Sequence, residues 1–88
     1  MDATTLLVLL EELASGLEIE VRYESMDSEA AFSSGGLCRI REKFVIIINQ
    51  KAALQDKIKI LGRALNRMDL GPVYMKPALR EFLEKMVS

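Results

Sequence analysis

The clearest pattern of apolar and polar positions is the alternation in "LEIEVRYE", residues Leu17–Glu24. Every second residue is apolar or aromatic, and every residue between them carries a charge. Because successive side chains of a β-strand point to opposite faces of the sheet, this alternation predicts a strand with one buried face and one solvated face.

A second strand is predicted over Leu37–Arg41, directly after the Gly35–Gly36 pair. The alternation places Cys38 and Ile40 on one face and the residues between and beside them on the other. We expect the face with Cys38 to point inward, which would make this cysteine a small residue of the core.

A third strand is predicted over Phe44–Asn49, after a tight turn around Glu42–Lys43. Its first five residues are all apolar, and continuous apolar strands are usually buried on both faces. We therefore expect this strand to be central in the sheet, with one side under the helices.

Val45 and Ile47, or else the three residues that alternate with them, would lie on the face that the other strands fill with charge. A second copy of the chain could cover that apolar surface, as could long side chains. The arginines that could reach across it are Arg22, Arg39 and Arg41.

Three segments have the periodicity of amphipathic helices: Ala3–Ser15, approximately Ala52–Met68, and a segment that begins at Pro77. Leu7 and Val8 widen the apolar arc of the first helix beyond what packing on one sheet face requires. We therefore expect either a third element or another subunit to cover these two residues.

The ends of the helices have recognisable signals. Asp2 is the expected N-cap of the first helix, and Gly16 is expected to adopt the left-handed conformation after its last turn. Proline is favoured in the first turn of a helix, which fits the start of the last one. The residues that this last helix is expected to bury are Leu79, Phe82, Leu83, Met86 and Val87.

These elements predict a single α+β domain over residues 1–88. The predicted order is a helix, a three-stranded, mostly antiparallel sheet and two further helices (α-β-β-β-α-α), with the helices chiefly on one face. The segment "SMDSEAAFSSGG" between the first two strands is expected to be a mobile loop with a short helical turn capped by Ser28.

The charge is divided unevenly along the chain, although the net charge is only −1. Residues 1–36 contain eight acids and one base, a net charge of −7, whereas residues 37–88 contain eleven bases and five acids, a net charge of +6. Two interpretations remain open. The halves could neutralise each other, with Arg39 and Arg41 opposite Glu18 or Glu20, or a basic surface could bind an acidic partner.

Lys59, Arg63 and Arg67 recur at steps of four and form a basic face on the second helix. Nucleic-acid binding through this face, with Arg39 and Arg41, is one hypothesis. The chain has a pI near 5.4, two tyrosines and three phenylalanines, which favour an ordinary solvated face or an acidic protein partner over nucleic acid.

The sequence argues against most enzyme classes. It has no histidine, so the commonest general base and transition-metal ligand are missing, and one cysteine cannot build a zinc site. No phosphate-binding glycine loop is present. An enzyme that uses Cys38, or the carboxylates of Glu18 and Glu20, is the remaining catalytic alternative. We expect neither a cofactor nor a metal.

A cytoplasmic location is expected, because a single cysteine cannot form an intrachain disulfide. The apolar "LLVLL" near the N-terminus is preceded by Asp2 and by no Lys or Arg, so a signal peptide is not expected. No apolar run approaches the roughly 20 residues of a membrane helix.

Two resemblances add to this reading. The order of a glycine-led strand, the hairpin strand "FVIIIN", a short linker and an amphipathic helix resembles the core of the ImmA/IrrE-type zinc peptidases, a zincin-like family, over about Gly35–Met68. The resemblance implies that the HExxH motif would fall on Gly62, Arg63 and Asn66, which would make the chain a metal-free relative without peptidase activity. The chain also resembles a group of short uncharacterised bacterial proteins with an "SGGLCR" segment, which implies no activity.

The leading hypothesis from the sequence is a small, non-enzymatic protein-interaction module that self-associates as a homodimer. Its candidate contact residues are Leu7, Val8, Val45 and Ile47. The alternative is binding of an acidic partner or nucleic acid through Lys59, Arg63 and Arg67.

Overall fold

The computed structural model describes residues 1–25 and 35–87. The predicted α+β class and the predicted order of elements are both confirmed. The elements are α1 (Ala3–Gly16), β1 (Glu20–Glu24), β2 (Gly35–Ile40), β3 (Lys43–Asn49), α2 (Leu54–Leu65) and α3 (Pro77–Met86). The expected helical turn capped by Ser28, in the expected mobile loop, lies outside the described residues.

The sheet is mixed, and β3 is its central strand, as the continuous apolar run predicts. The strand order is β1-β3-β2; β1 runs parallel to β3 and β2 runs antiparallel to it. Ile46 pairs with Val21 on one side and with Leu37 on the other. Because β3 has a neighbour on each side, the most apolar strand has no free edge.

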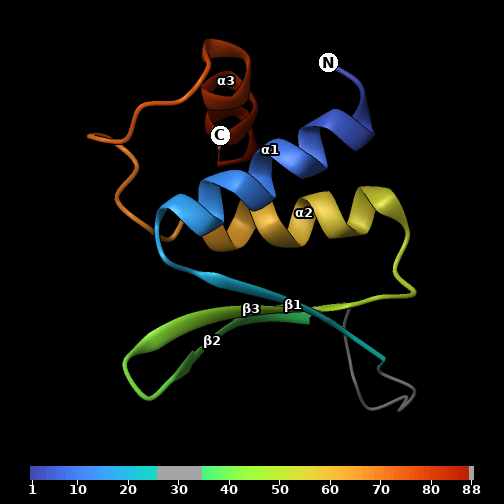
Figure 1. Cartoon of the computed structure of the whole chain (residues 1–88). Helices are drawn as coiled ribbons and strands as arrows, with labels where there is room; N and C mark the ends of the chain where they lie inside the picture. The colour runs from blue at the N-terminus through green and yellow to red at the C-terminus, as the bar shows by residue number, and fades with distance from the viewer. Residues whose placement is uncertain (26–34, 88) are drawn as a thin grey trace.

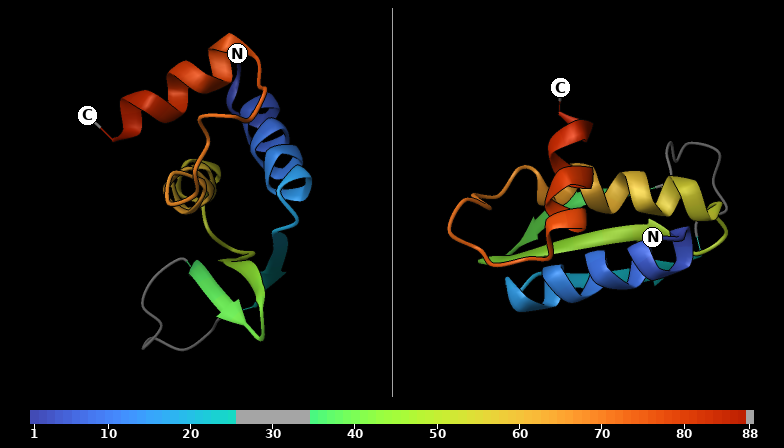
Figure 2. Two further views of the ribbon diagram at one scale, coloured as in Figure 1. Left: turned by 90° about the vertical axis from the view of Figure 1, so that its left-hand side faces the viewer. Right: turned by 90° about the horizontal axis from the view of Figure 1, so that it is seen from above.

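All three helices lie on one side of the sheet (Figure 1). Helices α1 and α2 lie side by side above the strands, and α3 crosses over them on the side away from the sheet (Figures 1 and 2). This arrangement confirms the expected placement of the helices. None of the helices within residues 1–25 and 35–87 lies over the opposite face of the sheet.

The core lies between the sheet and the layer formed by α1 and α2. Ile46 and Ile48 of β3 are completely buried there, together with Leu10 of α1 and with Leu61 and Leu65 of α2. Burial of each such side chain contributes about 1.5–3 kcal/mol, so these residues account for much of the stability of a small domain. Leu79 and Leu83 extend the core to α3.

The start of α1 follows the prediction and its end does not. The carboxylate of Asp2 accepts a hydrogen bond from the backbone N–H of Thr5 at 2.8 Å, as an N-cap should. Gly16 belongs to the helix itself, and the residue in the left-handed conformation is Glu18, with φ of 64°.

A Schellman motif explains this shift. The N–H of Ile19 bonds to the carbonyl of Ala14 at 2.9 Å, and the N–H of Glu18 bonds to the carbonyl of Ser15 at 3.0 Å. This pair of bonds requires the left-handed residue two positions after Gly16. The motif anchors Ile19 in the core just before β1 begins.

The other two helices also differ slightly from the predicted ranges. Helix α2 is shorter than the predicted Ala52–Met68, while α3 begins at Pro77 as expected. Val87 was expected to be buried but is 68% exposed, because it follows the last residue of α3. The guanidinium of Arg80 donates hydrogen bonds to the carbonyls of Leu70 and Val73, which ties α3 to the segment that precedes it.

Candidate interaction surfaces

The side of the sheet without a helix over it is called here the outer sheet face. The register places Glu20 and Cys38 beside Val45, and Arg22 and Gly36 beside Ile47. Alternation then assigns the remaining residues of each strand. The outer sheet face consists of Glu20, Arg22, Glu24, Gly36, Cys38, Ile40, Lys43, Val45, Ile47 and Asn49.

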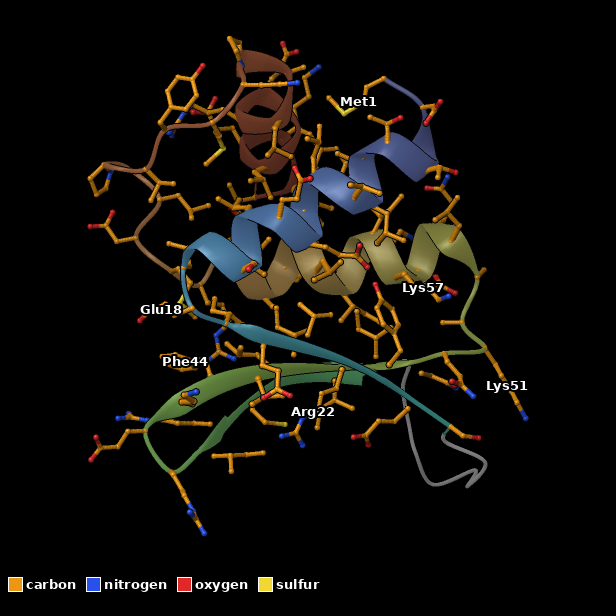
Figure 3. All side chains as sticks on the ribbon, viewed as in Figure 1. Met1, Glu18, Arg22, Phe44, Lys51 and Lys57 are labelled. Atoms are coloured by element: carbon orange, nitrogen blue, oxygen red, sulfur yellow. The ribbon has the colours of Figure 1, made fainter. Side chains whose placement is uncertain are left out.

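Val45 and Ile47 are therefore the β3 residues that face away from the helices, the first of the two possibilities that the sequence left open. Val45 is only 2% exposed, although no described helix covers it. It lies in a cleft of about 520 Å³ that is lined by charged side chains, among them Arg22, Arg41 and Lys43. Figure 3 shows Arg22 extending from the sheet on the side away from the helices. Long side chains of the same chain therefore cover Val45.

Ile40 and Cys38 are the exposed non-polar residues of this face. Ile40 is 42% exposed, and Cys38 is exposed as well. The prediction that Cys38 points into the core was wrong. That prediction assumed that the face of β2 with Cys38 and Ile40 packs under the helices. Instead, α2 packs on the face that holds Leu37 and Arg39.

The two arginines of the β hairpin do not pair across neighbouring strands with Glu18 or Glu20, which corrects the predicted placement of Arg39 and Arg41 opposite these acids. Strand β3 separates β2 from β1, and Arg39 lies on the helix side, where its guanidinium is 5.7 Å from the centroid of the Phe44 ring. Arg41 is in the hairpin turn, with φ of 57°. Glu20 instead binds Arg22, two residues along its own strand, at 2.8 Å.

The described residues contain two ion pairs, and each pair joins neighbours in the sequence. The first is Glu20–Arg22, in which the guanidinium lowers the pKa of the carboxyl group, and the second is Glu81–Lys85, at 3.9 Å. Neither ion pair joins the acidic half of the chain to the basic half. Acids and bases of the two halves nevertheless meet on the outer sheet face, where Glu20 lines the same cleft as Arg41 and Lys43.

Leu7 and Val8 of α1 have different environments. Leu7 is half-buried and packs against the core. Helix α3 also contacts α1, so the fold does contain a third element beside this helix. Val8 is 45% exposed. The structure therefore separates these two residues from Val45 and Ile47, which lie on the far side of the sheet.

Lys59 and Arg63 are exposed on α2, and Arg67 is exposed in the turn just after its end, so the three basic residues lie in the order that their spacing predicts. Two of them, Arg63 and Arg67, line a cleft of about 170 Å³ between α2 and β2. Apolar atoms of Leu37, Ile60 and Ala64 form the rest of its lining, with Gly36. The sequence could not predict this cleft, because it depends on which helix packs over which strand.

A cluster of three polar residues joins α1, β1 and α2. The hydroxyl of Tyr23 donates a hydrogen bond to the carboxylate of Glu11, and the ammonium of Lys57 lies 5.4 Å from the centroid of the tyrosine ring. Burial, reinforced by the bond to Glu11, raises the pKa of Tyr23 well above its ordinary value. In the sequence, only the tyrosine on the inward face of the predicted strand indicates such a cluster, because a partly buried hydroxyl needs a hydrogen-bond partner.

Two of the three positions implied by the zincin-like resemblance, Gly62 and Asn66, contact α3. Gly62 lies under Met86, and the side-chain amide of Asn66 donates to the carbonyl of Leu83 at 3.0 Å, while Arg63 is exposed. Among the residues that the structure describes, no group of three or more histidine, cysteine or acidic side chains could hold a metal ion.

A further apolar cleft, of about 400 Å³, lies between the end of α1 and the segment before α3. Leu9, Leu17 and Met75 are among its lining residues, and Tyr74, which is 89% exposed, lies at its border. Its lining carries one acid and one base, Glu12 and Lys76.

Comparison of the chain with family models, curated proteins and solved structures finds no match in any of the three. Within residues 1–25 and 35–87, no helix has the length and apolar character needed to cross a membrane.

Proposed function

We propose that the chain is a small, non-enzymatic interaction protein that forms a homodimer through its outer sheet face. The observation that supports this proposal is the position of Ile40, a large aliphatic residue that is 42% exposed on a sheet face with no described helix over it. Contact between two copies would remove Ile40, Cys38 and the exposed part of Ile47 from water. Burial of such apolar area contributes about 25 cal/mol per Å².

The charges around this surface suit a second copy. A two-fold symmetric interface brings the same surface together with itself, so it needs groups of both signs. The outer sheet face has two acids, Glu20 and Glu24, and two bases, Arg22 and Lys43. Acids of one copy could thus meet bases of the other. The single cysteine makes a reducing compartment such as the cytoplasm the expected location.

Light scattering coupled to size exclusion, over a range of protein concentrations, tests the proposal. We expect the wild type to be a dimer and Ile40→Glu to be a monomer with an unchanged circular dichroism spectrum. Val87→Glu is the matched control, because it places the same charge at a residue that is 68% exposed beyond α3, and it should stay dimeric. A wild type that is monomeric at submillimolar concentration would contradict the proposal.

A further inference from the structure

The free edge of β2 is the second candidate binding surface, and it is independent of the proposed dimer. Strand β2 pairs with β3 on one side, and no described strand pairs with its other side. An unpaired strand edge presents backbone N–H and C=O groups that another extended segment can bind.

The hairpin turn determines which backbone groups point to this edge. Ile40 and Lys43 pair across a two-residue turn, and in such hairpins the pair that closes the turn carries the ladder hydrogen bonds. Alternation from that pair directs the N–H and C=O groups of Leu37 and Arg39 toward the free edge. The side chain of Leu37 packs against the core on the helix side of the sheet, and that of Arg39 lies over the ring of Phe44 on the same side.

The cleft between α2 and β2 lies along the same edge. Leu37, Ile60 and Ala64 give it an apolar floor, and Arg63 and Arg67 line it as well. Neither arginine forms an ion pair with any residue within 1–25 and 35–87. A strand added beside β2 would direct every second side chain toward this cleft.

We propose that the free edge of β2 binds an extended, acidic segment of another protein, which adds as a fourth strand and places its carboxylates on Arg63 and Arg67. Backbone hydrogen bonds to Leu37 and Arg39 would hold the segment. The two guanidinium groups would select acidic side chains at alternate positions, because charge complementarity at such an interface sets specificity and the rate of association.

In two symmetric or helix-aligned arrangements, a second copy of the chain fits this edge poorly. If β2 paired with β2 of another copy around a two-fold axis, Arg63 and Arg67 of both copies would approach each other. If β1 of another copy paired there with its helices on the same side, Glu20 and Glu24 would point to the outer sheet face, away from both arginines. Each arrangement leaves the basic groups without acidic partners.

Nucleic acid is also disfavoured. Single-stranded nucleic acids bind through aromatic side chains on which their bases stack. Phe44 on the neighbouring strand β3 pairs with Arg39, whose guanidinium lies over its ring. The lining of the cleft has no aromatic residue among the described positions.

A displayed library of peptides of about ten residues, with acidic residues at alternate positions and the others randomised, provides the probe. We expect the wild type to enrich members of this library. The double variant Arg63→Gln/Arg67→Gln should bind the best peptide at least about tenfold more weakly by fluorescence anisotropy. Lys59→Gln is the matched control for one lost charge, because Lys59 is exposed on the same helix and does not line the cleft. It should bind nearly as well as the wild type.

Two N-methylated versions of the best peptide test strand addition directly. Each is methylated at alternate residues, one version on the odd positions and the other on the even positions. We expect only one version to lose binding, since a strand donates to its neighbour from every second residue.

Four results would overturn the proposal. The first is no enrichment of peptides from the library, and the second is equal weakening of binding by Lys59→Gln and by the single variant Arg63→Gln. The third is equal binding of both methylated peptides, and the fourth is displacement of the peptide by single-stranded DNA of the same charge at equal concentration.

Discussion

The hydroxyl of Tyr23 on β1 donates a hydrogen bond to the carboxylate of Glu11 on α1, across an interval of twelve residues. This bond crosses from the sheet to the helix layer. Lys57 approaches the same ring from α2, so one tyrosine contacts both helices that cover the sheet. Figure 3 labels Lys57, whose side chain extends from α2.

Tyr23→Phe should lower the free energy of unfolding by about 1 kcal/mol, because it leaves the Glu11 carboxylate without this donor. It should also change the dependence of stability on pH. The raised pKa means that the folded protein holds the phenolic proton more tightly than the unfolded chain, whose tyrosines titrate near pH 10. This contribution is complete below about pH 10 and is lost as the pH rises further.

Urea unfolding at neutral pH and above pH 10 measures both effects. The wild type should lose stability over the alkaline range more steeply than Tyr23→Phe. Tyr74→Phe is the matched control, because Tyr74 is 89% exposed, and it should retain the slope of the wild type. Parallel pH profiles for the wild type and Tyr23→Phe would contradict the raised pKa of Tyr23 in the folded protein.

Glu18→Gly should stabilise the protein by about 0.5–1 kcal/mol. Glu18 is the left-handed residue of the Schellman motif, with φ of 64°, and a residue with a Cβ atom is strained there by about 1–2 kcal/mol. Part of the gain is offset by the greater freedom of glycine in the unfolded chain. Glu12→Gly, in the exposed middle of α1, should instead cost about 1 kcal/mol. Thermal unfolding distinguishes the two, and a loss of stability in both would contradict the prediction.

Gly62→Leu should destabilise the protein by about 1–3 kcal/mol, because it overpacks the contact between α2 and α3. Even a Cβ atom at Gly62 would clash with the sulfur of Met86. The double variant Gly62→Leu/Met86→Ala should lose less stability than the two single variants together, since it provides room for the new side chain. Additive losses in chemical denaturation would mean that the methionine does not limit this position.

The reactivity of Cys38 should report dimer formation. Its thiol is exposed beside Ile40 on the outer sheet face, so a second copy on that face would shield it. We expect its rate of reaction with a chromogenic disulfide to fall several-fold as the protein concentration rises from micromolar to submillimolar. In Ile40→Glu the rate should not depend on concentration. A wild type that behaves like Ile40→Glu would place Cys38 outside any interface.

Local patterns predicted the elements of this fold well. Alternation identified Ile19, Val21 and Tyr23 as the inward face of the first strand, and the continuous apolar run identified β3 as the central strand. These predictions succeed because the side-chain periods of strands and helices are properties of the backbone itself. The cap at Asp2 and the start of α3 at Pro77 follow from equally local rules.

The errors and omissions concern relations between elements. Cys38 is outside rather than inside, and Arg39 is far from Glu20, because strand order and the position of α2 decide both. The left-handed position at Glu18 depends on how the chain leaves α1 to reach β1.

The sequence by itself determined the class of the fold, the order of its elements and the separation of acidic from basic residues along the chain. Tertiary structure alone decided that Glu20 shares a cleft with Arg41 and Lys43, and that Arg63 and Arg67 lie beside the free edge of β2. The physical reason is that periodicity assigns a residue to a face of its own element, whereas packing between elements distant in sequence decides what that face meets.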